Sequence, residues 1–181
     1  MTITYGFYNS VSGDRVYDAI DVSSMFDGVI IDGVFETIGD ALETTDGTGM
    51  NVVVGPGKAW FDHTWTLNDA ALTLAIAASD VILPRIDYVV LEVDASNAVR
   101  ANTIKVLTGT PATVPVPPTL TNTSEVHQYP LAEVAVDAGV SEILAADVTN
   151  LVGTAFCPFV TFPNTGTSGA GAAVLEVQVF S

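Results

Sequence analysis

The alternation of apolar and polar residues along the chain predicts a protein built mainly from β-strands. The clearest strand covers residues 85–93 (RIDYVVLEV), and residues 102–107 (NTIKVL) follow after a polar loop. Two such segments joined by a short loop predict an antiparallel hairpin. Further strands are expected at residues 50–54, 58–67 (folded back around Asp62-His63), 71–78 and 131–136, and at the two ends of the chain at 2–8 and 173–180.

One segment has helical spacing instead. The segment from Val16 through Ile20 and Ser23-Ser24 to Phe26 follows a spacing of three to four residues, and Asp18 and Asp21 favour the first turns of a helix. Gly28 is suited to end it. The pattern also predicts a second short helix or turn over residues 30–35, and a turn or single helical turn near Ala146.

Proline and glycine divide the chain. Residues 108–120 contain four prolines, which predicts an extended arm that lies on a surface and not a strand in a sheet centre. Residues 163–172 are rich in Gly, Ser and Thr and predict a connector, so the strand expected after it could pair with a neighbouring subunit. We therefore expect a segment with a short helix at 1–40, a β-sandwich-like domain at 41–160, and a linker with an extended C-terminal strand at 161–181.

The composition leaves two interpretations open. Apolar residues make up 49% of the chain and charged residues 14%, against about 25% charged in ordinary soluble domains. Mean hydropathy is +0.45. Either the chain has a β core dense in Val and Ala, or part of its apolar surface is buried against other copies or partners. No apolar run approaches the roughly 20 residues of a membrane helix, so no membrane partner is expected.

The charge argues against nucleic acid as a partner. The 21 acidic and 5 basic residues give a net charge of −16, and no cluster of Lys and Arg interrupts it. The single cysteine, Cys157, excludes an internal disulfide and is expected to be a buried structural thiol. The first ten residues lack the basic and apolar regions of a signal peptide, so synthesis in a cytoplasm is expected.

The sequence shows no motif for a reaction centre. It has no Gly-x-Ser-x-Gly, no phosphate-binding loop, no dinucleotide fingerprint and no His-Glu-x-x-His. Pairs of acids arise by chance among so many, and Asp27-Gly28 and Asp46-Gly47 fit plain turns better than calcium loops. We expect no catalytic residue, cofactor or metal.

One group of residues has two interpretations. Trp60, Asp62, His63 and Trp65 could form a sugar-binding or metal-binding loop. The alternative is a hairpin whose tryptophans fill the core while Asp62 and His63 occupy the turn. Strict alternation would place Trp60 and Asp62 on one face and Phe61 and His63 on the other, which favours the structural interpretation.

The order of motifs resembles a known family. The chain carries SSMFDGVIIDGVF, then GTGMNVVVGPGKAWFDHTWTLND, PRIDYVVLEVD, TGTPATVPVPP, VHQYPLAEVAVDAG and AADVTNLVG. These segments, over about residues 1–160, resemble siphophage minor tail proteins, which form the N-terminal virion-attachment region of baseplate, tail-fibre and receptor-binding proteins. The segment from Gly47 to Trp60 and the RID-x-VVL strand carry most of this resemblance.

The resemblance implies a structural protein of the virion tail, made in the host cytoplasm, β-rich and without catalysis. It implies homo-oligomers, trimers or hexamers, bound to other tail or baseplate proteins. Longer members continue into a fibre or host-binding domain, so an adaptor is expected here. The alternatives are a module that binds a host cell-surface glycan, a capsid decoration protein, and a cell-wall hydrolase.

Overall fold

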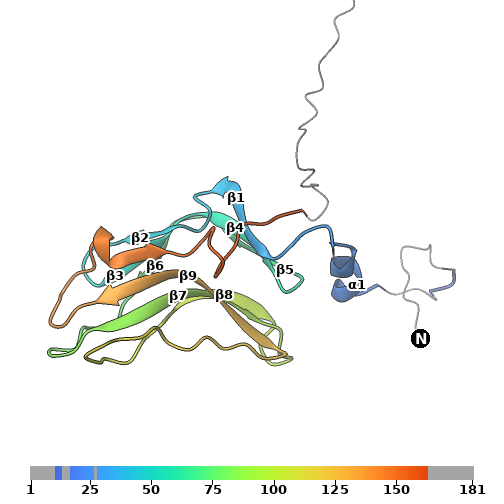
Figure 1. Cartoon of the computed structure of the whole chain (residues 1–181). Helices are drawn as coiled ribbons and strands as arrows, with labels where there is room; N and C mark the ends of the chain where they lie inside the picture. The colour runs from blue at the N-terminus through green and yellow to red at the C-terminus, as the bar shows by residue number, and fades with distance from the viewer. Residues whose placement is uncertain (1–10, 14–16, 27, 163–181) are drawn as a thin grey trace, which may run out of the picture.

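The computed structural model describes residues 11–13, 17–26 and 28–162, and these form two packed layers of β-sheet preceded by a short helix (Figure 1). The elements are α1 (Ala19–Ser23), a 3₁₀ turn (Ser24–Phe26), β1 (Gly33–Gly39), β2 (Thr44–Asp46), β3 (Asn51–Val54), β4 (Gly57–Phe61), β5 (Thr64–Asn68), β6 (Leu72–Ala75), β7 (Arg85–Asp94), β8 (Ala101–Leu107), β9 (Val126–Val136), a 3₁₀ turn (Ala145–Asp147) and β10 (Val148–Asn150).

The strands within this part of the chain make three sheets. One layer is the four-stranded sheet β10-β9-β7-β8, and the other combines the sheets β1-β4-β5 and β2-β3-β6. The prediction of a mainly β, sandwich-like protein with a short N-terminal helix is therefore confirmed. The strands predicted at 2–8 and 173–180 lie outside the described residues. No helix in the described ranges is both long and apolar enough to span a membrane.

The core lies between the two layers and follows the alternation along β7. Val89, Leu91 and Val93 are buried against Phe61 and other residues of the facing layer. Tyr88 and Val90 point to the opposite face, where they form a second apolar cluster with Leu151, Leu107 and Leu120. Because both faces of β7 are covered, this strand has the continuous apolar pattern of a buried strand. The predicted β7–β8 hairpin is confirmed, with pairs from Tyr88↔Leu107 to Asp94↔Ala101.

The proline-rich arm covers that second face. Residues 108–120 form no strand, and Leu120 packs against Tyr88 and Val90. Near the start of the arm, a Cβ added at Gly109 would lie 2.0 Å from the Ile86 carbonyl oxygen, so only glycine fits there. The prediction of an extended arm on a surface is confirmed.

A buried ion pair at the start of β7, between Arg85 and Asp87, also binds the start of the arm. The Arg85 guanidinium donates to both Asp87 carboxylate oxygens, at 2.9 and 3.2 Å, and both side chains are almost completely buried. Arg85 also donates to the carbonyls of Ala77 and Ala78, at 2.5 and 2.8 Å, and Asp87 accepts the Gly109 N–H at 2.8 Å. The pair thus fixes the loop before β7, the strand itself and the arm.

The Asn150 side chain and residues 158–160 form hydrogen bonds along the outer strands of the layers. Asn150 of β10 donates to the Thr44 carbonyl at 2.8 Å and accepts the Thr44 N–H at 2.7 Å, as a neighbouring strand would. Residues 158–160 lie parallel to β1 and bond to Val34 through Pro158 O and Val160 N. These contacts protect edges that would otherwise be open to other chains.

The helix or turn predicted at residues 30–35 is wrong. β1 begins at Gly33, and Val34 pairs with Ala59 of β4 on one side and with Phe159 on the other. Those partners are distant in sequence, so the local pattern could not reveal them. The predicted helix is confirmed but short: Asp18 caps it, through its bonds to the Ile20 and Asp21 N–H groups, and helical turns continue only to Phe26.

Replacing the buried carboxylate should destabilise the whole sandwich. Asp87→Asn keeps the side-chain shape but leaves the Arg85 charge buried without its counter-ion, so the free energy of unfolding should fall by about 3–5 kcal/mol. Lys105→Gln is the matched control, because Lys105 pairs with Glu92 at a partly exposed site and should cost less than about 1 kcal/mol. Urea denaturation of both variants measures the difference, and equal losses would contradict the role assigned to the pair.

Candidate functional site

A tight turn at the tip of the β4–β5 hairpin separates two groups of side chains. Asp62 and His63 both have positive φ, 47° and 61°, between the paired residues Phe61 and Thr64. Two successive left-handed residues make the type I′ turn whose twist suits a two-residue hairpin. The strand alternation ends at this turn, so Asp62 and His63 need not follow the faces of their strands.

The tryptophans lie on the outer face of the hairpin. Trp60 and Trp65 are directly paired across β4 and β5, and Trp65 is 61% exposed. Trp60 is half-buried by an edge-to-face contact with Phe26, with ring centroids 5.5 Å apart. The interpretation in which the tryptophans fill the core is wrong. The inward positions of β4 belong to Gly57, Ala59 and Phe61.

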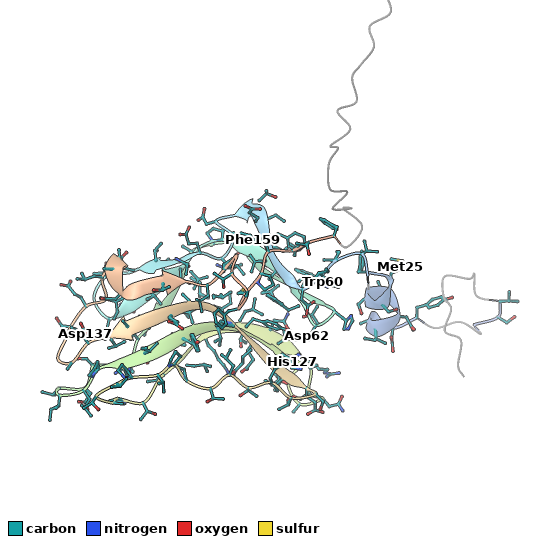
Figure 2. All side chains as sticks on the ribbon, viewed as in Figure 1. Met25, Trp60, Asp62, His127, Asp137 and Phe159 are labelled. Atoms are coloured by element: carbon teal, nitrogen blue, oxygen red, sulfur yellow. The ribbon has the colours of Figure 1, made fainter. Side chains whose placement is uncertain are left out.

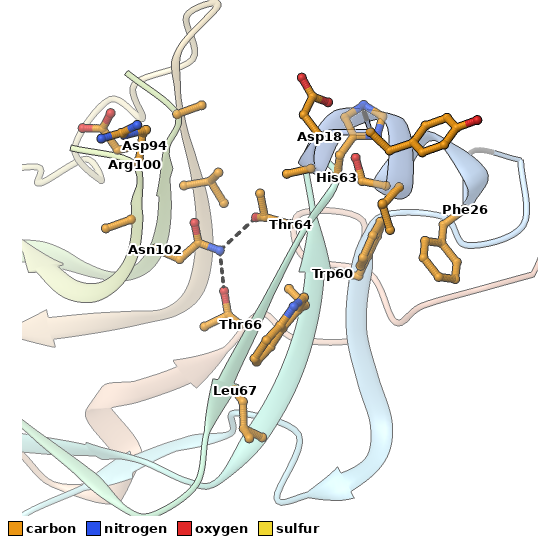
Figure 3. Close-up of a pocket in the computed structure, with 18 residues that line it drawn as sticks. Asp18, Phe26, Trp60, His63, Thr64, Thr66, Leu67, Asp94, Arg100 and Asn102 are labelled. Atoms are coloured by element: carbon orange, nitrogen blue, oxygen red, sulfur yellow. Dashed lines mark hydrogen bonds between the residues drawn. The ribbon is translucent and has the colours of Figure 1, made fainter. Parts of the chain in front are cut away.

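These tryptophans line an open groove of about 1070 Å³ between the helical segment, the β4–β5 hairpin and the β7–β8 loop (Figure 3). Val22, Phe26 and Leu67 contribute apolar surface, and His63, Asp94 and Arg100 contribute polar groups. Asn102 lies on the wall opposite the helix and donates to the Thr64 and Thr66 hydroxyls, at 2.9 and 2.8 Å. These two bonds join the edge of β8 to the edge of β5.

Asp62 lies on the other side of the turn, against β9 (Figure 2). Its carboxylate accepts the Tyr129 hydroxyl at 2.8 Å and contacts His127 Nδ1 at 2.7 Å. Its backbone N–H donates to Asp32 at 3.3 Å. The Tyr129 ring stacks on Phe61 with centroids 3.8 Å apart, so the cluster begins where the core ends.

The contacts of His127 favour the form of the ring in which both nitrogens carry a proton. Nδ1 faces the Asp62 carboxylate and Nε2 faces the Thr123 carbonyl oxygen, and both partners are acceptors. The hydrogen bond to Asp62, more than any other contact, raises the pKa of His127. Burial raises the pKa of Asp32 and of Tyr129, so the Tyr129 hydroxyl remains a donor to Asp62.

The structure thus brings together three of the four residues predicted as a glycan site. Trp60, His63 and Trp65 line the groove, whereas Asp62 belongs to the separate cluster with Asp32, His127 and Tyr129. The expected faces were wrong for the turn pair, because the type I′ turn and not the alternation sets their directions. Cys157 is buried as predicted, and burial raises the pKa of its thiol to about 12.

Several site residues were missed from the sequence. Arg100 and Asn102 gave no signal beyond their place in a predicted hairpin. His127 and Tyr129 are two residues apart, the spacing that puts both on one face of a strand. That spacing could have indicated a polar pair, but nothing local links it to Asp62, 67 residues from Tyr129. Among the described residues, no three His, Cys, Asp or Glu side chains are grouped as metal ligands.

Comparison of the chain with models of protein families, with curated proteins and with solved structures gives no match. The groove and the exposed surface around it are therefore the basis for the functional inference.

Stability should fall as the pH rises through the raised pKa of His127. The folded state binds this proton more tightly than the unfolded chain, so the stabilisation is complete below pH of about 6.5 and is lost above the folded-state pKa. The urea midpoint should decrease between pH 6 and pH 9, and His127→Gln should remove much of that decrease. His63→Gln, on the groove side of the turn, is the control and should keep it. An unchanged slope in His127→Gln would contradict the assignment.

Proposed function

We propose that this chain is a non-enzymatic structural protein of a phage tail, an adaptor at the tail tip or baseplate that holds part of the host-recognition apparatus. The observation that carries the proposal is the exposed apolar surface of the helical segment (residues 19–26) and of the loop between it and β1. Ile20, Met25, Val29 and Ile31 expose 46–58% of their surface, and no residue of α1 is buried.

A helix of this kind is poorly stabilised by its own protein. α1 has five residues, far fewer than the roughly 12–15 that give an isolated helix marginal stability in water. The neighbouring Phe26 is attached to the sandwich through Trp60, while Met25 points away from the layers (Figure 2). An apolar surface on such a helix is typical of a segment that docks on a partner.

The sequence supports the same conclusion. This apolar surface lies within the first 40 residues, and so within the range of about residues 1–160 that resembles the virion-attachment region of minor tail proteins. The remaining surface is acidic, which favours protein partners over nucleic acid. The low charged fraction also favours a chain that buries surface in an assembly.

Labelling of virions tests this placement. Gold-conjugated antibody against the purified chain should mark the tail tip or baseplate of the phage that encodes it, as seen by negative-stain microscopy. Label over the head would replace the proposal with a capsid decoration protein. Absence of label from every part of the virion would contradict both proposals. An antibody against the major capsid protein is the positive control for labelling.

The groove favours a second candidate, a module that binds a host cell-surface glycan. Trp60 and Trp65 supply aromatic surface, and Asp94, Arg100 and Asn102 supply polar groups around it, the combination found in many ligand sites. Against it, the Lys58 ammonium already lies over the Trp65 ring, 5.5 Å from its centroid. This contact competes with stacking of a sugar on that face.

Retention on host cell walls distinguishes this candidate. If the groove binds a glycan, Trp65→Ala should lose at least tenfold in affinity for purified wall polysaccharide while its urea midpoint stays unchanged. Phe156→Ala, which removes another exposed aromatic ring outside the groove, should bind as the unaltered chain does. Absence of binding by the unaltered chain would eliminate the glycan candidate and leave the adaptor.

A further inference from the structure

The strand β6 has an open edge in the described part of the chain. It pairs with β3 on one side and with no strand on the other. The Ile76 N–H bonds to the Met50 carbonyl at 2.9 Å. Because hydrogen-bonded pairs alternate along antiparallel strands, Thr73 and Ala75 direct their N–H and C=O groups away from β3. Both residues are exposed, and these groups have no hydrogen-bond partner among the described residues.

This edge lacks the features that keep other chains from pairing with a sheet. Edge strands are usually protected by charged residues, prolines, bulges or a covering segment. Residues 70–79 (AALTLAIAAS) contain no charge and no proline, and the β3–β6 pairing has no register shift. The other edges differ: residues 158–160 cover β1, and Asn150 joins β10 to β2. Asn102 joins β5 to β8, which also carries Lys105.

Apolar side chains along the same edge are only half-buried. Leu72 and Leu74 of β6 point toward the core, and Ile104 and Val106 of β8 pack against the same cluster. β8 lies on the β6 side of the sandwich, because Asn102 joins it to β5, the strand that directly precedes β6. A strand added to β6 would therefore cover apolar surface as well as bond to the open backbone groups.

The chain itself contains a segment whose pattern matches this edge. Residues 173–180 (AVLEVQVF) lie outside the described residues, and their sequence alternates. In an extended strand, Leu175, Val177 and Val179 share one face, whereas Glu176 and Gln178 share the other. The apolar face would continue the half-buried row of β6, and the polar face would continue its exposed row.

The place where the described chain ends argues for pairing between copies. Residues 158–160 lie outside β1, and the Thr161 carbonyl accepts the Ile31 N–H, at the end of the layer where Trp60 lies. A strand antiparallel to β6 begins beside Ala75, about 30 Å along the strands and about 19 Å across them, so roughly 35 Å away. The Gly- and Ser-rich linker between residues 162 and 173 spans on average only about 18 Å.

We propose that residues 173–180 of one copy pair antiparallel with β6 of a second copy, as an added strand. Strand addition obtains its affinity from main-chain hydrogen bonds and its specificity from alternate side chains. Each chain has one such segment and one such edge, so the contact is head-to-tail and closes into a ring when its rotation permits. The inference goes beyond the proposed adaptor function, because it concerns contact between copies wherever the chain lies in a virion.

The contact predicts a specific pattern of assembly. Thr73→Pro removes an N–H that β3 does not use and blocks the edge, and Val177→Pro interrupts the added strand. In sedimentation velocity at micromolar concentration, the unaltered chain should be larger than a monomer, and each variant alone should be a monomer. An equimolar mixture should form dimers and nothing larger, because one intact edge and one intact strand remain to meet.

Hydrogen exchange tests the same contact without any change in the sandwich. In the assembled unaltered chain, the amides of Thr73 and Ala75 should exchange at least tenfold more slowly than in Val177→Pro, which alters no described residue. Dilution of the unaltered chain should remove this protection. Thr73→Val and Val177→Ile keep the backbone N–H groups and the side-chain pattern, so these matched controls should assemble as the unaltered chain does.

Several outcomes would overturn the proposal. A monomeric unaltered chain with protected Thr73 and Ala75 amides would show that the segment pairs within its own chain. A monomeric chain with unprotected amides, proline variants that keep full assembly, or a mixture that stays monomeric would each exclude the added strand. A failure of the adaptor function is a separate result, shown by absence of antibody label from virions whatever the state of assembly.

Discussion

The buried Arg85–Asp87 pair is the interaction on which the arrangement of this protein depends. Arg85 donates to the carbonyls of Ala77 and Ala78, and Asp87 accepts the N–H of Gly109. The pair therefore connects the loop before β7, β7 itself and the proline-rich arm. A charged pair with so many fixed partners tolerates little displacement in a dry site. The positions of β7, of the loop that carries Val81 and Ile82, and of the arm on the outer face follow from it.

The layers depend on side chains as well as strands. Asn150 and Asn102 each bridge from the four-stranded sheet to the facing layer, at β2 and at β5. At the groove end, the Asp62 cluster adds a third connection through β9. The sandwich is therefore closed by polar contacts around an apolar interior. That arrangement leaves the outer face of the β4–β5 hairpin free to carry Trp60 and Trp65.

Local patterns predicted those parts of the fold that local forces determine. The β7–β8 hairpin follows from alternation around a short loop, and the arm follows from the prolines at 108–120. β1 could not be predicted, because its residues form a strand only through β4 and residues 158–160. The candidate site also contains residues that the sequence could predict and residues that it could not. The sequence indicated the tryptophans, but the directions of Asp62 and His63 depend on backbone angles in the turn, and the partners of Asp62 are set by tertiary contacts.

The Asn102 bridge gives the groove a particular mechanical property. β5 and β8 face each other there through two side-chain hydrogen bonds, to Thr64 and Thr66, and not through a ladder of backbone pairs. A groove wall of this kind can be displaced by breaking two bonds whose donors and acceptors then find water. Each strand meanwhile keeps the full set of pairs with its own hairpin partner. Separating β5 from β8 at this seam would therefore break fewer hydrogen bonds than separating the two strands of either hairpin.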